Sequence, residues 1–280
     1  MTVKIVTDSS ADLPAQLAQE LGITVVPLYV RFGEEVYRER VDISEDEFYQ
    51  KLLHGPIHPV TILPSPQDFA NVYQELSPEA DGIVSIHISA KLSGTCNSAL
   101  QGKEWVEKRC PIEVIDSLSV SVALGLISIA AATAAKAGAD LQRVVEEVKQ
   151  IIPNIHVLVL ADTLEYLRLG GRIGKAEALV GSVLNVKPVL TLKDGEVVPV
   201  GRAHTRSKGI ERLFEFAKNA TNIQDLAVAY STTLNEAQTL AERIGSIFTK
   251  EPIKIARLGT TLGVHLGPGA LVVAFRGKSP

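Results

Sequence analysis

The chain has few aromatic and sulfur-containing residues: aromatics make up 5% of its 280 residues, and it contains two cysteines and one methionine. A nucleic-acid binder normally carries a basic face with stacking aromatics, whereas this chain has a net charge of −4 and no basic run interleaved with aromatics. Cys96 and Cys110 have neither CxxC nor metal-ligand spacing. We therefore expect no nucleic-acid partner, no metal site and reduced thiols. Since MTVKIVTDSS does not resemble an export signal, we also expect a cytoplasmic location.

Long hydrophobic segments are also scarce. One uncharged stretch, SLSVSVALGLISIAAATAA at 117–135, has the length of a membrane span. It is rich in Ser, Ala, Gly and Thr, which makes it much less hydrophobic than a span built from Leu, Ile and Phe. We predict a buried helix between a sheet and another layer, and no integral membrane segment.

Several common catalytic motifs are missing, namely GxxxxGK[ST], GxGxxG after the first strand, HExxH and GxSxG. A serine hydrolase stays open nevertheless, because a triad is defined by geometry and the chain contains His87 and His265. His87 lies in an expected strand, which favours a core or interface role. His265, in a Gly-rich stretch, suits either a site residue or a local hydrogen-bond donor.

The first half repeats one pattern, in which an apolar strand leads through a hydroxyl-rich turn into an amphipathic helix. This alternation predicts an α/β fold with a parallel sheet covered on both faces. Ligands of such sheets bind at the carboxyl ends of the strands, here the segments 7–10, 89–95 and 116–119. Helix-end signals are Asp12, Ser65 and the Ser44/Glu47 capping box at helix starts, and Gly22 at a helix end.

The second half indicates α+β structure. KPVLTLKDGEVVPVGRA predicts a hairpin that turns at Asp194-Gly195, and a strand at DLAVAYST lies between two expected helices. IKIARLG and ALVVAF read as closing strands separated by a Gly-rich turn, TTLGVHLGPG. We predict two domains, residues 1–161 and 162–280, with the ligand between them.

A possible ligand anchor lies at 83–98, IVSIHISAKLSGTCNS, where a buried strand is followed by Ser93, Gly94 and Thr95 ahead of a helix. Unpaired amides at a helix start favour a carboxylate or phosphate, and a glycine allows close approach. The alternative interpretation is an ordinary helix cap, for which Ser and Thr are common.

Taken together, these stretches resemble the DegV family of bacterial fatty-acid-binding proteins along essentially the whole chain. Five segments carry the resemblance through their order and spacing: VTDSSADLP, ISAKLSGTCNSA, VIDSLSVSVALG, LEYLRLGGRIGKAEALVGSVLNVKPVLTLKDGEVVPVGRAHT and GVHLGPGALVVAF. The resemblance implies a fold of the EDD type, with a Rossmann-like N-terminal domain and an α/β C-terminal domain that hold a long-chain fatty acid between them.

The resemblance also implies a role without catalysis or a cofactor. Such a protein presents the acyl carboxylate to a separate dihydroxyacetone-kinase-like fatty acid kinase, which makes acyl-phosphate for phospholipid synthesis. Two alternatives stay open: an enzyme acting on an acyl substrate, either a serine hydrolase or a phosphotransferase, and a carrier of another apolar acid.

The resemblance assigns the ligand site residue by residue. One departure concerns the Pro-rich loop, where the family commonly has TSQPS and this chain has TILPS, with apolar Ile62 and Leu63. The implied carboxylate-binding residues are Thr61, Ser93, His265 and Arg172, and those near the site or facing the partner are Arg202, Gly94, Thr95 and Ser117.

Overall fold

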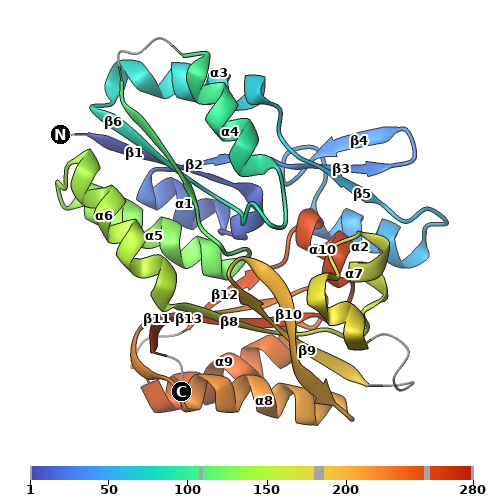
Figure 1. Ribbon diagram of the computed structural model, residues 1–280. Helices are drawn as coiled ribbons and strands as arrows, with labels where there is room; N and C mark the ends of the chain where they lie inside the picture. Colours follow the sequence, from blue (N-terminus) through green and yellow to red (C-terminus); the bar gives the residue numbers. More distant parts are fainter. Residues whose placement is uncertain (1, 107–109, 180–185, 249–252, 279–280) are drawn as a thin grey trace.

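The computed structural model describes residues 2–106, 110–179, 186–248 and 253–278. Within these ranges, two sheets lie one above the other, with a small third sheet at one side (Figure 1). The four 3₁₀ turns are η1 (Ser9–Ala11), η2 (Ser77–Glu79), η3 (Ile152–Asn154) and η4 (Gly174–Leu179).

The first sheet is parallel and has the order β2-β1-β6-β7, as the alternating pattern predicts. Its strands are β1 (Val3–Asp8), β2 (Ile23–Val26), β6 (Gly82–His87) and β7 (Ile112–Asp116). One face packs against α3 (Pro66–Leu76) and α4 (Thr95–Glu104), the other against α1 (Ala15–Leu21), α5 (Val122–Lys136) and α6 (Leu141–Ile151) (Figure 1).

The second sheet is mixed and has the order β10-β9-β8-β13-β11-β12. Its strands are β8 (Ile155–Leu160), β9 (Lys187–Lys193), β10 (Glu196–Ala203), β11 (Thr221–Tyr230), β12 (Lys254–Arg257) and β13 (Leu271–Lys278). Helices α8 (Arg206–Lys218) and α9 (Leu234–Phe248) cover one face, and the start of α5 packs on the other. The small-residue helix predicted at 117–135 therefore lies between the two sheets, beginning at Val122.

The third sheet, β4-β3-β5, links the two halves of the molecule. It consists of β3 (Tyr29–Phe32), β4 (Glu35–Arg38) and β5 (Val60–Ile62). Together with α2 (Glu45–His54) it packs against α10 (Thr260–Leu266), which also contacts α7 (Glu165–Leu169). Segments from both ends of the chain thus meet beside the two larger sheets.

Local signals set many of the boundaries as expected. Ser44 and Glu47 form the capping box of α2, Ser65 caps α3, and Gly22 ends α1 in the left-handed conformation. At the hairpin, Asp194 and Gly195 both have positive φ, as a two-residue turn of this type requires.

Several expectations about the first half are wrong. Asp12 does not cap α1; Pro14 holds that position, and the Asp12 carboxylate accepts from the Gly259 amide. The apolar segment ITVVPLYVRF at 23–32 predicts one strand, but it forms two, because the chain leaves the first sheet at Pro27, which has no N–H to donate. The Pro-rich stretch read as a loop contains the short strand β5. The segment SALQGKEWVEKR at 98–109 predicts a helix; α4 begins earlier, at Thr95, and ends at Glu104, and residues 107–109 lie outside the described residues.

In the second half, the Gly-rich turn at 260–269 is helical in its first part, α10. Gly263 explains this difference, since a Cβ there would lie 2.3 Å from a ring carbon of Phe48. The glycine allows close packing of a helix onto α2, which its sequence neighbourhood does not reveal.

The division at residues 161/162 stays a prediction. Strand β8 precedes it in the chain and pairs within the second sheet, so that sheet begins at Ile155. Across the described residues, no helix combines the length and the hydropathy that crossing a bilayer requires.

Candidate functional site

A cavity lies where the two large sheets, α10 and β5 meet. Leu, Ile and Val supply all of its apolar lining side chains, which include Leu28, Ile88, Val157, Leu190 and Leu262. The surface is aliphatic, as the low aromatic content predicts. Such a wall offers dispersion contacts along the whole length of a flexible apolar ligand without fixing a ring orientation.

Three polar lining residues donate their hydroxyl protons to protein acceptors. Ser121 donates to Asp12 at 2.7 Å, Thr191 to the carbonyl of Val157 at 2.6 Å, and Thr261 to Glu39 at 2.9 Å. Because these protons are already paired with buried acceptors, this part of the wall has little to offer a polar ligand group.

The remaining polar lining residues are Thr61, Ser93, Arg172 and His265, the four residues that the resemblance assigns to the carboxylate. They come from β5, the turn before α4, the turn after α7, and α10. The structure thus brings them together on one cavity although they span more than 200 positions of the chain.

Thr61 and His265 form a direct contact, with Oγ1 3.2 Å from Nε2. The other ring nitrogen, Nδ1, is buried and has no hydrogen-bond partner among the described residues. A proton on Nδ1 would therefore be an unpaired buried donor, which favours the tautomer that carries its proton on Nε2. In that tautomer His265 donates to Thr61, and the Thr61 hydroxyl proton is available to a ligand.

The same reasoning applies to Ser93. Its Oγ lies 2.8 Å from Oγ1 of Thr95 and accepts from the Thr95 amide at 3.3 Å. Thr95 is fully buried and has Ser93 as its side-chain partner within the described chain, so donation from Thr95 to Ser93 satisfies the buried hydroxyl. The Ser93 proton is then left for a ligand. Ser93 and Thr61 consequently offer two donors of the kind that a carboxylate accepts.

Arg172 supplies a positive charge at the exposed edge of the cavity. Its Nε donates to the Leu92 carbonyl at 3.2 Å and its Nη1 to the Gly170 carbonyl at 2.8 Å. These two contacts fix the guanidinium between the turn after α7 and the turn before α4. A cation held here by neutral carbonyls keeps its charge available to an anionic group.

The electrostatic environment keeps His265 neutral. Burial, the Arg172 charge and His58 lower its pKa from 6.5 to about 4. At neutral pH the imidazole is therefore a single-proton donor rather than a cation, consistent with its contact to Thr61.

Four further predicted residues lie outside the cavity lining. Gly94 is the N-cap of α4 and lies close to the Leu63 side chain, and Thr95 supports Ser93 from behind. Ser117 is buried and bonds within its own turn, and Arg202 lies half-buried on β10 opposite Pro188. Gly94 and Thr95 therefore neighbour the site, whereas Ser117 and Arg202 lie apart from it.

Sequence reasoning missed Ser121, Thr191, Thr261 and Leu63 as lining residues. Thr191 had a usable signal, because it occupies an inward position in an alternating strand. Leu63 is a departure from the family pattern in the Pro-rich loop, and in the structure it packs toward Gly94 and lines the cavity. The roles of Ser121 and Thr261 depend on acids far away in the chain, Asp12 and Glu39.

A Ser–His–Asp arrangement does exist, but away from the cavity. His87 lies 3.0 Å from Asp8 and 2.7 Å from Ser85, and all three residues are fully buried. None of them lines the cavity as described, so His87 is a core residue, as its place in a strand predicts. The described hydrogen bonds of the Ser93 hydroxyl are with Thr95.

These features define an α/β protein with two large sheets around an aliphatic cavity that has hydroxyl, imidazole and guanidinium groups at one end. The family model described as "Uncharacterised protein, DegV family" matches residues 2–278. The chain belongs to the DegV family, and the resemblance seen in its sequence is confirmed.

Curated relatives match over nearly their entire length. A DegV domain-containing protein of Streptomyces coelicolor is 38% identical over 281 residues, which cover 99% of each chain. One from Halalkalibacterium halodurans is 36% identical over 280 residues, 98% of each chain.

Solved structures share the fold closely. A fatty-acid-binding DegV family protein from Thermus thermophilus superposes with a TM-score of 0.91 at 35% identity, covering 99% of this chain and 100% of that one. DegV of Bacillus subtilis, a fatty acid binding protein, gives 0.91 at 29% identity and the same coverage. A stearic acid-binding protein from Eubacterium ventriosum gives 0.90 at 28% identity and covers 98% of each chain.

Proposed function

We propose that this chain binds a long-chain fatty acid in the aliphatic cavity, with the carboxylate at the end formed by Thr61, Ser93, His265 and Arg172. The observation that carries the proposal is the division of the polar lining residues into two sets. Hydroxyls elsewhere in the cavity are paired with protein acceptors, whereas Thr61 and Ser93 can donate to a ligand. Fatty acid binding by DegV proteins of the same fold supports it.

The acyl chain provides the binding energy in this proposal. Each buried methylene contributes about 0.8 kcal/mol, so a long chain contributes on the order of 10 kcal/mol before ordering costs. The Leu, Ile and Val lining is suited to this contribution because it contains few groups that prefer water. The head group then determines which way the chain lies.

The carboxylate can stay ionised in this position. Two hydroxyl donors and the Arg172 guanidinium match its acceptors, and the neutral His265 holds Thr61 in place without adding charge. An uncharged ester or alcohol would lose the interaction with Arg172, which favours an acid over other apolar ligands.

The proposal includes presentation of the carboxylate to a separate kinase. Its support is that the polar end is the exposed end: Arg172 and Gly94 are exposed, and Leu63 is 41% exposed. A partner can therefore approach the carboxylate while the acyl chain stays buried. In this scheme the partner transfers a phosphoryl group from a nucleoside triphosphate to the carboxylate, and this chain acts as a carrier without catalysing the step.

Denaturing extraction of the purified protein followed by mass spectrometry tests the binding. We expect close to one fatty acid per chain. Recovery of ligand-free protein that also fails to bind added palmitic acid would contradict the proposal. Incubation with nucleoside triphosphate, magnesium and fatty acid in the absence of a kinase should give no acyl-phosphate, and turnover there would instead identify an enzyme.

The second candidate function is transport of a different apolar acid, such as an isoprenoid acid. The aliphatic lining suits a branched apolar acid as well as a straight-chain fatty acid, because methyl branches pack equally well against Leu and Val. The same extraction distinguishes the two, since the mass of the released acid identifies its carbon skeleton.

A further inference from the structure

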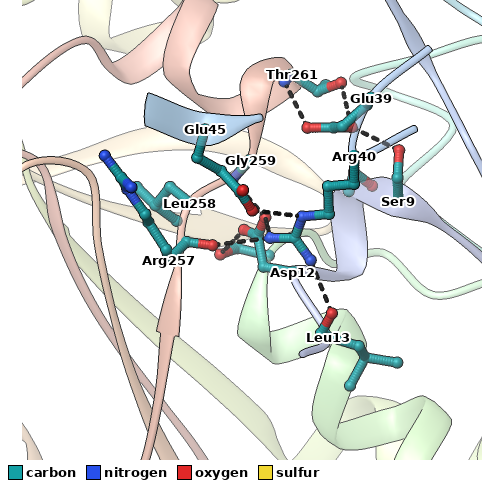
Figure 2. A network of polar contacts seen from close by, with 12 residues as sticks. Ser9, Asp12, Leu13, Glu39, Arg40, Glu45, Arg257, Leu258, Gly259 and Thr261 are labelled. Carbon is teal, nitrogen blue, oxygen red and sulfur yellow. Dashed lines mark hydrogen bonds and ion pairs between the residues drawn. The ribbon is translucent and has the colours of Figure 1, made fainter. Parts of the chain in front are cut away.

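A buried acidic network lies next to the cavity at the junction of the two halves (Figure 2). Glu39 follows β4 and is 1% exposed. One carboxylate oxygen accepts from the Thr261 amide at 2.9 Å, and the other accepts from the Thr261 hydroxyl at 2.9 Å and from the Ser9 hydroxyl. A side chain from the N-terminal half thus holds the beginning of α10, more than 200 positions away.

This contact takes the place of a helix cap. The N-cap residue of α10 is Gly259, which has no side chain to pair with the first amides of the helix. Glu39 supplies the missing acceptor, and its negative charge favours the positive end of the helix dipole. A Cβ on Gly259 would lie 2.2 Å from a carboxylate oxygen of Glu39, so the absence of a side chain at Gly259 allows the carboxylate to approach the start of the helix.

Helix α10 is short, and its two polar cavity-lining residues lie on one face. Thr261 and His265 are four positions apart, which places both on the same side of a helix, and both line the cavity. The direction of the His265 ring therefore depends on where the helix begins and how it is rotated. Glu39 fixes both at Thr261, by holding its amide and its hydroxyl together.

The rest of the network fixes the adjoining chain. Asp12 accepts from the Gly259 amide at 2.8 Å and from Ser121, and Arg40 reaches the carbonyls of Leu13 and Arg257. Three of these members, Asp12, Arg40 and Ser121, have positive φ although none is glycine. Non-glycine residues in this conformation persist where the surroundings determine them strongly, and they concentrate at functional sites.

Stability alone is a poor explanation for this arrangement. Arg40 contacts Asp12 at 3.4 Å and Glu45 at 2.9 Å, and Glu39 is buried beside them. Buried ionic groups usually cost as much in desolvation as they return in attraction. What the network provides instead is a fixed position for the first turn of α10.

We propose that Glu39 is a positioning residue of the ligand site, which acts through α10 to orient His265 toward Thr61. The inference rests on the proposed function for its effect on affinity. Its effect on His265 can be measured without any ligand.

The test uses nitrogen-15 NMR of histidine-labelled, ligand-free protein, which reports which imidazole nitrogen carries the proton, with His265→Gln to assign the signals. Glu39→Gln keeps the size of the side chain but replaces one acceptor oxygen by a donor. We expect it to shift His265 from the Nε2–H tautomer to a mixture. We also expect it to weaken palmitic acid binding about tenfold.

The matched control is Glu45→Gln, which removes an acid that pairs with Arg40 and has no hydrogen bond to α10 among the described contacts. We expect wild-type His265 signals and affinity from it. Unchanged His265 signals in Glu39→Gln, or an equal change in Glu45→Gln, would overturn the proposal.

A second variant covers the case in which Glu39→Gln does not fold. Thr261→Val removes the hydroxyl donor to Glu39 and leaves the carboxylate in place, so His265 should change in the same direction and by a smaller amount. Wild-type His265 signals in that variant would overturn the positioning role. If the wild-type protein binds no palmitic acid, the proposed function fails, while the His265 signals still decide this inference.

Discussion

His265 Nε2 lies 3.2 Å from Thr61 Oγ1, and this contact joins helix α10 near the end of the chain to strand β5 in its first half. Because Nδ1 of the same ring is buried without a partner among the described residues, the proton belongs on Nε2. The Thr61 hydroxyl is then a donor to whatever occupies the cavity, and the neighbouring residues can be tested on that basis.

Ser93→Ala separates ligand binding from helix capping. A hydrogen bond to a charged group contributes about 1.5–3 kcal/mol, so fatty acid affinity should fall roughly 10- to 100-fold. The cap position of α4 is Gly94, but the Ser93 hydroxyl also accepts from the buried Thr95 hydroxyl, so its removal should lower stability by about 1–3 kcal/mol as well. Affinity by calorimetry and melting temperature measure the two effects. Near-wild-type affinity with a lowered melting temperature would contradict the assignment of Ser93 to the carboxylate.

Gly170→Ala should damage the site through His265. A Cβ on Gly170 would lie 2.1 Å from His265 Nδ1, so the ring must move and the contact with Thr61 is lost. We expect affinity to fall at least tenfold, because one carboxylate donor loses its support.

Gly245→Ala is the matched control for this change. Gly245 lies on helix α9, and among the described residues its Cβ would meet only Ile253, at 3.7 Å, which is an ordinary van der Waals contact. Affinity should be unchanged and stability equal or higher by up to about 1 kcal/mol. Equal affinities of both variants would show that Gly170 does not act on His265.

Asp12 and His265 should change the free energy of unfolding in opposite directions as the pH rises. Burial raises the pKa of Asp12 from 3.8 to about 7, outweighing the Arg40 charge, so the folded state keeps a proton that the unfolded state loses. The free energy of unfolding therefore falls as pH rises from about 4 to about 7. The pKa of His265 is lowered from 6.5 to about 4, so the unfolded state gains a proton first and the free energy of unfolding falls as pH drops across that interval.

Single variants should reveal each dependence. Between pH 4.5 and 6.5, roughly the range where the two effects overlap, Asp12→Asn should leave stability rising with pH, and His265→Gln should leave it falling. Each slope should approach about 1.4 kcal/mol per pH unit. Urea unfolding at three pH values measures them. Profiles parallel to the wild type in both variants would show that neither group titrates in this way.

Arg202→Ala tests the proposed contact surface for a kinase. Arg202 lies on β10 and does not line the cavity, so removing it should leave fatty acid affinity unchanged. If this surface contacts the partner, kinase-dependent acyl-phosphate formation should slow several-fold, since rim charges mainly affect association. The initial rate with limiting carrier measures it, and unchanged kinetics would remove Arg202 from the partner surface.

Much of the fold followed from local signals. Alternating strands and helices gave the parallel sheet, Asp194-Gly195 gave the hairpin, and Ser44 and Ser65 gave two helix starts. Each of these depends on neighbours within a few positions, which is the range a sequence pattern covers.

What failed depended on partners distant in the chain. The helix at Gly263 packs closely against Phe48, which only a residue without a side chain permits. Asp12 does not cap α1, because its carboxylate accepts from Gly259 and Ser121 instead. Thr61 could be assigned only through the resemblance, since nothing in its own loop marks it as a partner of His265. Sequence patterns could not indicate that the Thr261 hydroxyl is bound to Glu39.

A crystal structure of the protein loaded with palmitic acid is the most direct test of the central claim. The account predicts an acyl chain along the Leu, Ile and Val lining, with carboxylate oxygens within about 3.2 Å of Thr61 Oγ1 and Ser93 Oγ. A carboxylate placed at Ser121 and Thr261, or an acyl chain bound outside the cavity, would contradict it.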